Sequence, residues 1–255
     1  MHSAVPAPAP ARHALNGSPP LLTPTTPNRL LAALPRNMRE RITDEATTVD
    51  MVFGDILVEP GHTQRGIYFP QTGFVSLVAR VKGHPPLEMG LIGTEGLLGA
   101  TLALGVDTAP LGAVVQGSGT ALCLAASRFK RCVQDSPALE KLLHRYLYVV
   151  MAQLARSAAC ARFHEVSPRL ARWLLMTQDR TEGSQLHLTH QFLADMLGVR
   201  RSAVTIAAGQ FQDRGLIKYT RGDITVLDRK GLEAASCECY AATRRDYAGM
   251  MGAEE

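Results

Sequence analysis

The sequence predicts an α+β protein: an N-terminal region of short strands that form a β-roll, barrel or sandwich, then a long helix, then a C-terminal winged helix-turn-helix. Three observations predict this order. Glycine recurs every few residues from Gly54 to Gly119 and is then absent from residue 120 to residue 182. Helix-compatible residues run unbroken from 138 to 163. Residues 188–218 carry a small residue, a glycine and a branched residue at the spacing of two crossing helices.

The composition is that of a soluble globular protein, with 255 residues, 46% apolar and 20% charged, and a net charge of +4. Since no run approaches 18 apolar residues, we expect no membrane partner. Residues 1–28 hold seven prolines and no apolar stretch of the kind that export needs. We expect this segment to be a disordered tail and the protein to be cytoplasmic.

The glycine-rich region predicts short strands joined by tight turns. The segments "GIYF", "GFVSLVARV" and "LEMGLIG" place apolar and β-branched side chains between turn signals. Several short strands at this spacing are typical of a β-roll, barrel or sandwich. The glycine-free stretch that follows is expected to be helical.

A long helix is expected from Ala138 to Phe163, because Ser136 can cap it and Pro137 suits its first position. Apolar and small residues repeat along it at the 4-3 spacing of a coiled-coil seam, which predicts a homodimer interface. The predicted dimer residues are Leu139, Leu143, Tyr146, Val150, Gln153 and Ser157. A second helix is expected with Ser167 as its cap and Pro168 at its first position.

The segment "LTHQFLADMLGVRRSAVTIAAGQFQDRGLIK" (188–218) predicts the helix-turn-helix. Thr189 can cap its first helix. Ala194 is small enough for the helix crossing, Gly198 can adopt the positive φ of the turn, and Val204 points back into the core. After Gly215, two short β runs flank a turn at residues 221–223 and predict a wing.

The outward face of the second helix has the chemistry of a double-stranded DNA reader. No acid lies between Asp195 and Asp213, arginine can contact guanine in a bidentate manner, and serine or threonine can contact base edges or phosphate. The predicted DNA contacts are Thr189, His190, Arg200, Arg201, Ser202, Thr205, Lys218 and Arg221.

These segments together resemble the Crp/Fnr family of transcription regulators. Both "LTHQFLADMLGVRRSAVTIAAGQFQDRGLI" and "FGDILVEPG…GIYFPQTGFVSLVA" are similar to that family, over residues 29–232. The resemblance implies a cyclic-nucleotide-binding-like sensor domain at 29–135, a dimerisation helix at 136–166, a winged helix-turn-helix at 167–232 and a C-terminal tail at 233–255. It also implies an inverted-repeat operator and RNA polymerase as a partner. Ser202 and Ile206 depart from the family pattern, which implies a different half-site.

The resemblance places a degenerate effector pocket at Gly99, Ala100, Pro110 and Leu111, where cyclic-nucleotide binders carry a Gly-Glu pair and an Arg-Thr or Arg-Ser pair. A shifted register would make Glu95 the acid, but no arginine lies between Arg80 and Arg128. A phosphate buried there would lack a charge partner. We therefore expect no response to cyclic AMP, and the sequence identifies no effector and no cofactor.

The five cysteines are scattered, and residues 1–122 contain none, so we expect reduced thiols rather than an N-terminal metal cluster. Cys237 and Cys239 alone do not fill a tetrahedral site, so no metal is predicted, although a thiol or metal redox sensor stays an alternative. We expect His144 and His164 to be surface or interface residues. The sequence carries none of the strong catalytic motifs, which predicts that the protein is not an enzyme. The remaining alternative is a protein-interaction module without DNA binding.

Overall fold

The computed structural model describes residues 28–181, 185–220 and 222–252 of the chain. The predicted disordered tail lies outside the described residues, except for Asn28. Asn28 is fully buried: its side chain caps the first helix and donates to the carbonyl oxygens of Pro70 (3.0 Å) and Gly96 (2.8 Å). Asn28 is therefore part of the folded chain and not of the tail.

The N-terminal part is a β-roll built from two antiparallel sheets, with strand orders β1-β7-β3 and β2-β6-β4-β5. Their strands are β1 (Thr47–Met51), β2 (Ile56–Val58), β3 (Gly66–Pro70), β4 (Phe74–Ala79), β5 (Leu87–Ile92), β6 (Gly112–Gly117) and β7 (Gly119–Ala125). The sheets enclose an apolar core that includes Met51, Val75, Ile92 and Val115. The predicted α+β class with a β-roll is confirmed.

The segments expected to be strands form β3, β4 and β5, with two differences. Strand β4 does not alternate, because five of its six residues are buried between its neighbouring strands, the core and the C-terminal domain. Strand β7 lies in the glycine-free stretch that was expected to be helical. Its central place between β1 and β3 gives it partners on both edges, which supply the pairing that no turn signal announced.

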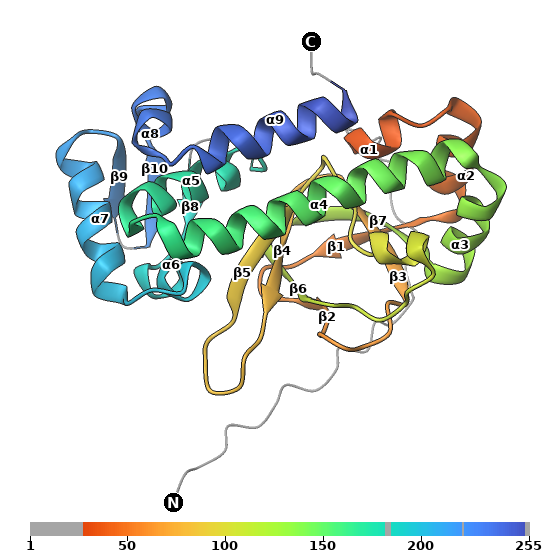
Figure 1. Ribbon diagram of the computed structural model, residues 1–255, viewed down its shortest axis with the longest axis horizontal. Helices are drawn as coiled ribbons and strands as arrows, with labels where there is room; N and C mark the ends of the chain where they lie inside the picture. The colour runs from red at the N-terminus through yellow and green to blue at the C-terminus, as the bar shows by residue number, and fades with distance from the viewer. Residues whose placement is uncertain (1–27, 182–184, 221, 253–255) are drawn as a thin grey trace, which may run out of the picture.

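Short helices close the end of the β-roll that lies near the start of the long helix (Figure 1). They are α1 (Arg29–Ala32), α2 (Arg36–Glu45), the 3-10 helix η1 (Ala100–Leu104) and α3 (Ala126–Asp135). Their buried residues share a second core with β3, β7 and the first half of the long helix.

The long helix α4 spans Pro137–Phe163 and crosses the whole molecule in Figure 1. As predicted, the Ser136 side chain caps it by accepting from the Leu139 amide (3.2 Å), and Pro137 stands in its first turn. Helix α5 begins at Val166 rather than after a Ser167 cap. The Ser167 hydroxyl instead donates to the side chain of Gln210 (2.9 Å), so it joins two helices of the C-terminal domain.

The C-terminal domain is a helical core with a three-stranded wing, ordered β8-β10-β9. Its elements are α5 (Val166–Gln178), β8 (Gln185–His187), α6 (His190–Leu197), α7 (Arg201–Asp213), β9 (Ile217–Thr220), β10 (Asp223–Val226) and α8 (Arg229–Ala235). Phe74 and Leu91 of the β-roll belong to the same buried cluster as this domain. The two domains therefore share packing.

The predicted C-terminal tail is wrong over the part that the structure describes. Residues Cys239–Met251 form helix α9, which runs back alongside α4 (Figure 1). The helix reaches the β-roll, where the Tyr247 hydroxyl donates to the Glu95 carbonyl oxygen (2.7 Å). Among the described helices, none combines the length and the apolar composition of a membrane span.

Candidate nucleic-acid interface

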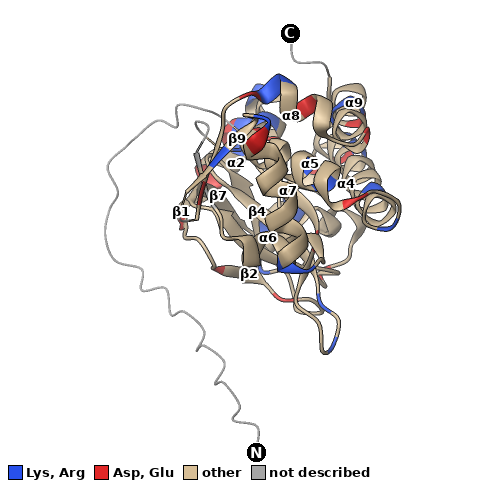
Figure 2. Ribbon diagram, turned by 90° about the vertical axis from the view of Figure 1, so that its left-hand side faces the viewer, with Lys and Arg blue, Asp and Glu red and all other residues tan. Residues whose placement is uncertain are grey.

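The turn between α6 and α7 has the geometry that the sequence predicts. The Thr189 hydroxyl caps α6 by accepting from the Phe192 amide (3.1 Å). Gly198 ends that helix in the left-handed conformation (φ 63°, ψ 40°), which glycine adopts without steric cost. Ala194 and Val204 are buried where the two helices meet. Figure 2 views the molecule from the end where these helices lie.

The N-terminal turn of α7 presents polar side chains to solvent. Arg200 occupies the N-cap position, and Arg200, Arg201 and Ser202 are all exposed. Ile206, one turn further on, is 63% exposed, although it is apolar. An exposed helix N-terminus with two arginines and no acid attracts phosphate and can enter a major groove.

His190 and Thr205 lie at the same surface, where their side chains hydrogen-bond to each other. The Thr205 hydroxyl donates to the Arg201 carbonyl oxygen (3.1 Å) and lies 3.0 Å from His190 Nδ1. The His190 ring stacks on Tyr219 of the wing, with ring centroids 4.2 Å apart. Burial lowers the pKa of His190 below its usual value, and the positive charge of Arg201 lowers it further. A neutral, stacked His190 serves to fix α6 against the wing.

The wing carries the exposed Lys218 on β9, next to the helix-turn-helix. Strand β9 pairs with β10, and Lys218 stands opposite Thr225. The other predicted wing contact, Arg221, lies outside the described residues.

The helix-turn-helix domain is held against the β-roll by polar contacts to α5. The Trp173 indole donates to one oxygen of Glu88 (2.8 Å), and Ser76 of β4 donates to the other (2.6 Å). Arg180, which follows α5, forms an ion pair with Glu95 (2.7 Å) in which both side chains are about nine-tenths buried. These contacts fix the orientation of the domain that carries α7.

Apolar contacts reinforce the same attachment. The Phe192 ring of α6 packs against Phe53 of the β-roll, with centroids 6.0 Å apart. Gly198 sits so close to Leu87 of β5 that a Cβ atom there would lie 2.8 Å from its side chain.

The predicted dimer seam on α4 faces the inside of the chain. Leu139, Leu143 and Tyr146 lie in the core formed with the β-roll, and Val150 packs partly against it. The Gln153 side chain bonds to both backbone groups of Leu91. The seam therefore buries its residues against this chain's own strands, and the sixth residue, Ser157, accepts from Arg172. These six residues therefore contact their own chain, which leaves little of this stripe free for a partner helix.

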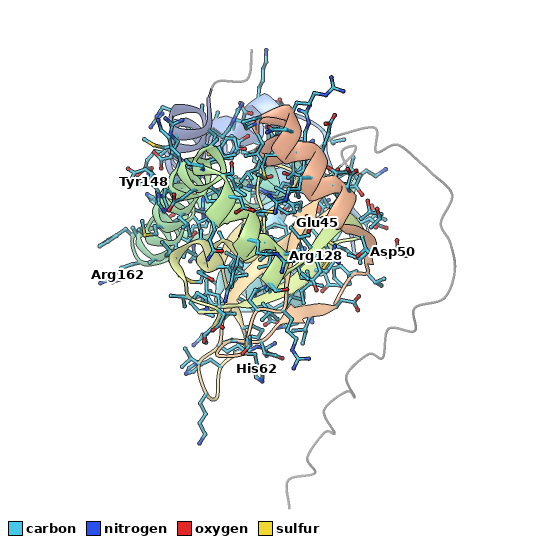
Figure 3. The ribbon with its side chains drawn as sticks, turned by 90° about the vertical axis from the view of Figure 1, so that its right-hand side faces the viewer. Glu45, Asp50, His62, Arg128, Tyr148 and Arg162 are labelled. Carbon is cyan, nitrogen blue, oxygen red and sulfur yellow. The ribbon has the colours of Figure 1, made fainter. Side chains whose placement is uncertain are left out.

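The opposite face of α4 is open. Tyr148 is 50% exposed and Met151 is 61% exposed, and Ala155, Ala158 and Arg162 continue the same row toward the end of the helix. Figure 3 shows Tyr148 and Arg162 on the outer side of the helix, away from the β-roll. These five residues repeat every three or four positions, so they form one continuous stripe, which we call the outer face of α4.

The predicted effector pocket is closed at Gly99 by side chains of the β-roll. A Cβ on Gly99 would lie 2.5 Å from Ile67 and 3.3 Å from Gln64, and Ala100 is buried. Pro110 is exposed and Leu111 packs against the core between the sheets. Glu95, the acid that a shifted register would supply, is paired with Arg180.

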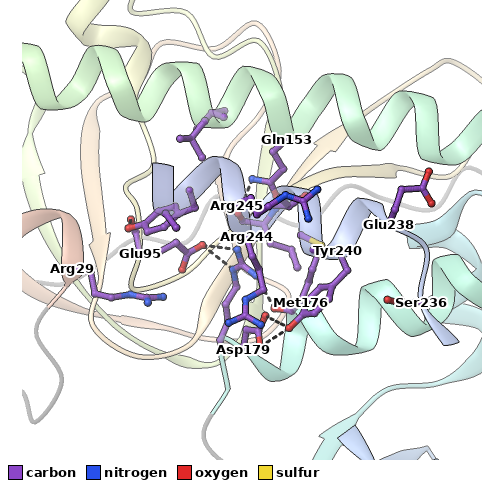
Figure 4. Close-up of a pocket in the computed structure, with 18 of the residues that line it drawn as sticks. Arg29, Glu95, Gln153, Met176, Asp179, Ser236, Glu238, Tyr240, Arg244 and Arg245 are labelled. Carbon is purple, nitrogen blue, oxygen red and sulfur yellow. Dashed lines mark hydrogen bonds and ion pairs between the residues drawn. The ribbon is translucent and has the colours of Figure 1, made fainter. Parts of the chain in front are cut away.

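A cavity of about 710 Å³ lies elsewhere, between α4, α5 and α9 (Figure 4). Its wall includes the Glu95–Arg180 pair, and Tyr240 at one side donates to Asp179 (3.0 Å). This cavity was not predicted, because residues 233–255 were expected to be a tail and α9 forms one of its walls.

A cluster of cysteines and a histidine beside the cavity was not predicted either. Cys237 and Cys239 lie at the start of α9, against Cys160 and His164 at the end of α4. The spacing of these residues along the chain does not predict the cluster, because the pair on α4 and the pair next to α9 are more than 70 residues apart.

Comparison with known proteins agrees with this architecture. Residues 168–235 match the family model of the Crp-like helix-turn-helix domain. No curated protein matches the sequence significantly. Many solved structures match, and those described below have coverages of 74–75% of this chain and 98–99% of theirs.

The c-di-GMP responsive global regulator CLP of Xanthomonas campestris has a TM-score of 0.62 at 19% identity. FixK2 of Bradyrhizobium japonicum has a TM-score of 0.63 at 14% identity. A transcriptional regulator of the CRP/FNR family from Thermus thermophilus has a TM-score of 0.59 at 24% identity. At these identities the likeness establishes a shared fold, and the Xanthomonas campestris and Thermus thermophilus proteins are regulators rather than enzymes.

Proposed function

Since this chain carries a Crp-like helix-turn-helix domain on the fold of Crp/Fnr transcription regulators, we propose that it binds an inverted-repeat operator in double-stranded DNA as a homodimer. The observation that carries the proposal is the exposed N-terminal turn of α7. Arg200, Arg201 and Ser202 project from it without a neighbouring acid, beside the exposed Lys218 of the wing.

Different residues of this surface have different tasks. Arg201 stands in the first turn of α7, where a guanidinium can reach a guanine edge and read sequence. Lys218 lies on the wing strand, where an ammonium can neutralise a phosphate without reading sequence. His190 and Thr205 support this surface by fixing α6 against α7 and the wing.

The outer face of α4 supports the homodimer. Tyr148 and Met151 offer apolar surface, while Ala155 and Ala158 are small enough for a second helix to approach closely. Two copies that pair in parallel through this stripe are related by a two-fold axis along the helices, which places both α7 helices at the same end of the dimer. Such a dimer recognises two half-sites about one helical turn apart.

The β-roll of this protein is proposed not to respond to cyclic AMP. Ile67 and Gln64 close the space beside Gly99, and Glu95 is engaged by Arg180. Calorimetry at millimolar cyclic AMP or cyclic GMP should therefore show no binding heat. Micromolar binding of either nucleotide would overturn this part of the proposal.

The DNA-binding proposal is tested by selecting duplexes from random DNA and measuring competition binding on the selected site and its single-base variants. Arg201→Ala should cost about 1–3 kcal/mol and relax the preference at one position per half-site. Lys218→Ala should weaken all sequences alike and lower the salt slope by about one. Arg131→Ala, an exposed arginine of α3, is the matched control and should change neither quantity.

The same assay separates the proposal from a protein-interaction module. Affinity for duplex that falls steeply with salt supports DNA binding. Unchanged binding by Arg201→Ala would show that α7 does not read DNA.

The dimer is tested by Met151→Glu. This change places two carboxylates near the two-fold axis, so it should yield monomers in sedimentation while the melting temperature of the monomer stays the same. An undisturbed dimer would show that α4 does not pair through its outer face.

A further inference from the structure

Three buried thiols and a histidine converge where α4 ends and α9 begins. Cys160 and His164 are one helical turn apart at the end of α4, and Cys237 and Cys239 flank Glu238. The ligand atoms of these four residues all lie within 4.8 Å of one another. The three cysteines are at most 7% exposed and pack on one another as a separate buried cluster.

The spacing suits one tetrahedral ion. Zinc–sulfur bonds of about 2.3 Å and a zinc–nitrogen bond of about 2.0 Å place neighbouring ligand atoms roughly 3.5–3.8 Å apart. Cys160 Sγ lies 3.6 Å from Cys237 Sγ, and Cys239 Sγ lies 3.7 Å from His164 Nδ1. These separations are far longer than the roughly 2.05 Å of a disulfide. An iron–sulfur cluster would spread its four ligands further apart, because they are divided among two or four iron atoms.

Glu238 gives His164 the orientation that a metal ligand needs. Its carboxylate lies 3.1 Å from His164 Nε2, while the other ring nitrogen, Nδ1, faces Cys239. A proton on Nε2 that is donated to Glu238 leaves the Nδ1 lone pair directed at the thiols. Histidines that bind metals commonly donate their second nitrogen to a carboxylate in this way.

The charges around the cluster are also those that a bound zinc ion requires. One Zn²⁺ with three thiolates and a neutral histidine carries a net charge of −1. Two arginines lie beside the cluster: Arg169 and Arg172 line the same small cavity as Cys160. Their positive charges can offset the negative charge of the zinc-bound group.

We propose that Cys160, His164, Cys237 and Cys239 bind one Zn²⁺ ion, which fastens α9 to the end of α4. The site also adjoins the helix-turn-helix: the Arg169 guanidinium donates to the carbonyl oxygen of Leu197, which precedes Gly198, and the Cys237 amide donates to the Pro168 carbonyl oxygen (3.4 Å). Zinc therefore stabilises the junction of the long helix, α9 and the DNA-binding domain. This site stands independently of the DNA-binding proposal.

The test uses the full-length protein, reduced, stripped of metal and titrated with Zn²⁺ against a chromophoric competitor. We expect one zinc per chain, and with Co²⁺ an absorption band from thiolate-to-metal charge transfer together with tetrahedral d–d bands. Glu238→Gln should weaken zinc binding by about 10- to 100-fold. Cys239→Ser removes a ligand outright and should weaken binding by more than that. Cys123→Ser, a cysteine of the β-roll outside the cluster, is the matched control.

The outcomes divide clearly. Stoichiometric zinc that is lost in Cys239→Ser but kept in Cys123→Ser supports the site. Less than about one zinc per two chains at saturating Zn²⁺, equal binding by Cys239→Ser, or iron bound in preference to zinc would overturn it. The zinc stoichiometry and the cobalt spectrum of the wild-type protein test the site by themselves, so the proposal can be refuted even if a variant fails to fold.

Discussion

Glu88 joins the two domains through a carboxyl group whose protonation the structure controls. Burial raises the pKa of Glu88 to about 7, although the hydrogen bonds from Ser76 and Trp173 and the charges of Arg172 and Arg180 oppose the rise. A glutamate in the unfolded chain has a pKa of about 4.3. The native protein therefore binds more protons than the unfolded chain between these two values.

The sign of the pH dependence follows from that difference. Where the native state binds more protons, stability falls as the pH rises. The contribution of Glu88 is fully present below about pH 4, declines through the interval up to the folded pKa of about 7, and is flat above it. At about 1.36 kcal/mol per pH unit, the loss between pH 5 and pH 8 is at most about 2.5 kcal/mol.

Glu88→Gln removes this loss while it keeps an oxygen that accepts from the Trp173 indole. We expect the variant to have nearly the wild-type free energy of unfolding at pH 5 and to be more stable at pH 8 by up to about 2.5 kcal/mol. Urea titrations at pH 5, 6, 7 and 8 measure the difference. The exposed Glu140→Gln on α4 is the control and should give a constant offset. A constant offset for Glu88→Gln as well would refute the argument, because it would mean that the site ionises equally in both states.

Two further changes test the attachment of the helix-turn-helix to the β-roll. Gly198→Ala forces a left-handed backbone on alanine and brings its Cβ to 2.8 Å from Leu87, so thermal unfolding should show that the free energy of unfolding falls by about 1–2 kcal/mol. The control, Gly209→Ala, lies inside α7 with open space around it and should stabilise the protein by about 0.5–1 kcal/mol. Equal effects of the two changes would contradict the turn geometry. Arg180→Met leaves the Glu95 carboxylate buried without its partner and should lower the free energy of unfolding in urea by about 3–5 kcal/mol. Glu95→Gln in the same chain should restore most of this loss. A loss under about 1 kcal/mol for Arg180→Met alone would show that solvent screens the ion pair.

The sequence predicted the features that depend on local chemistry. Ser136 and Thr189 cap helices because their hydroxyls reach an amide three residues ahead, and Gly198 turns because its backbone tolerates a positive φ. The matched Crp-like domain and the shared fold confirm the helix-turn-helix and the β-roll. The periodicity along α4 also correctly identified a buried stripe, yet periodicity alone does not say whether a helix packs on its own chain or on a partner. Here the β-roll covers the stripe, so the face left for a partner is the less apolar one.

The features that were missed depend on contacts between distant segments. Helix α9 has a mixed sequence, "CYAATRRDYAGMM". Its apolar side is buried only because α4 and the loop that carries Glu95 lie beside it. Cys237 and Cys239 offer two ligands at CxC spacing, which is half of a tetrahedral site. The other half comes from the end of α4, where Cys160 was one of five scattered cysteines and His164 was expected to be a surface or interface histidine. Neither pair carries a metal-site signature by itself, and α9 must fold back onto α4 before four ligands exist. For the same reason, the metal and the packing of α9 stabilise each other: an ion that binds only the folded arrangement adds its binding free energy to the stability of that arrangement.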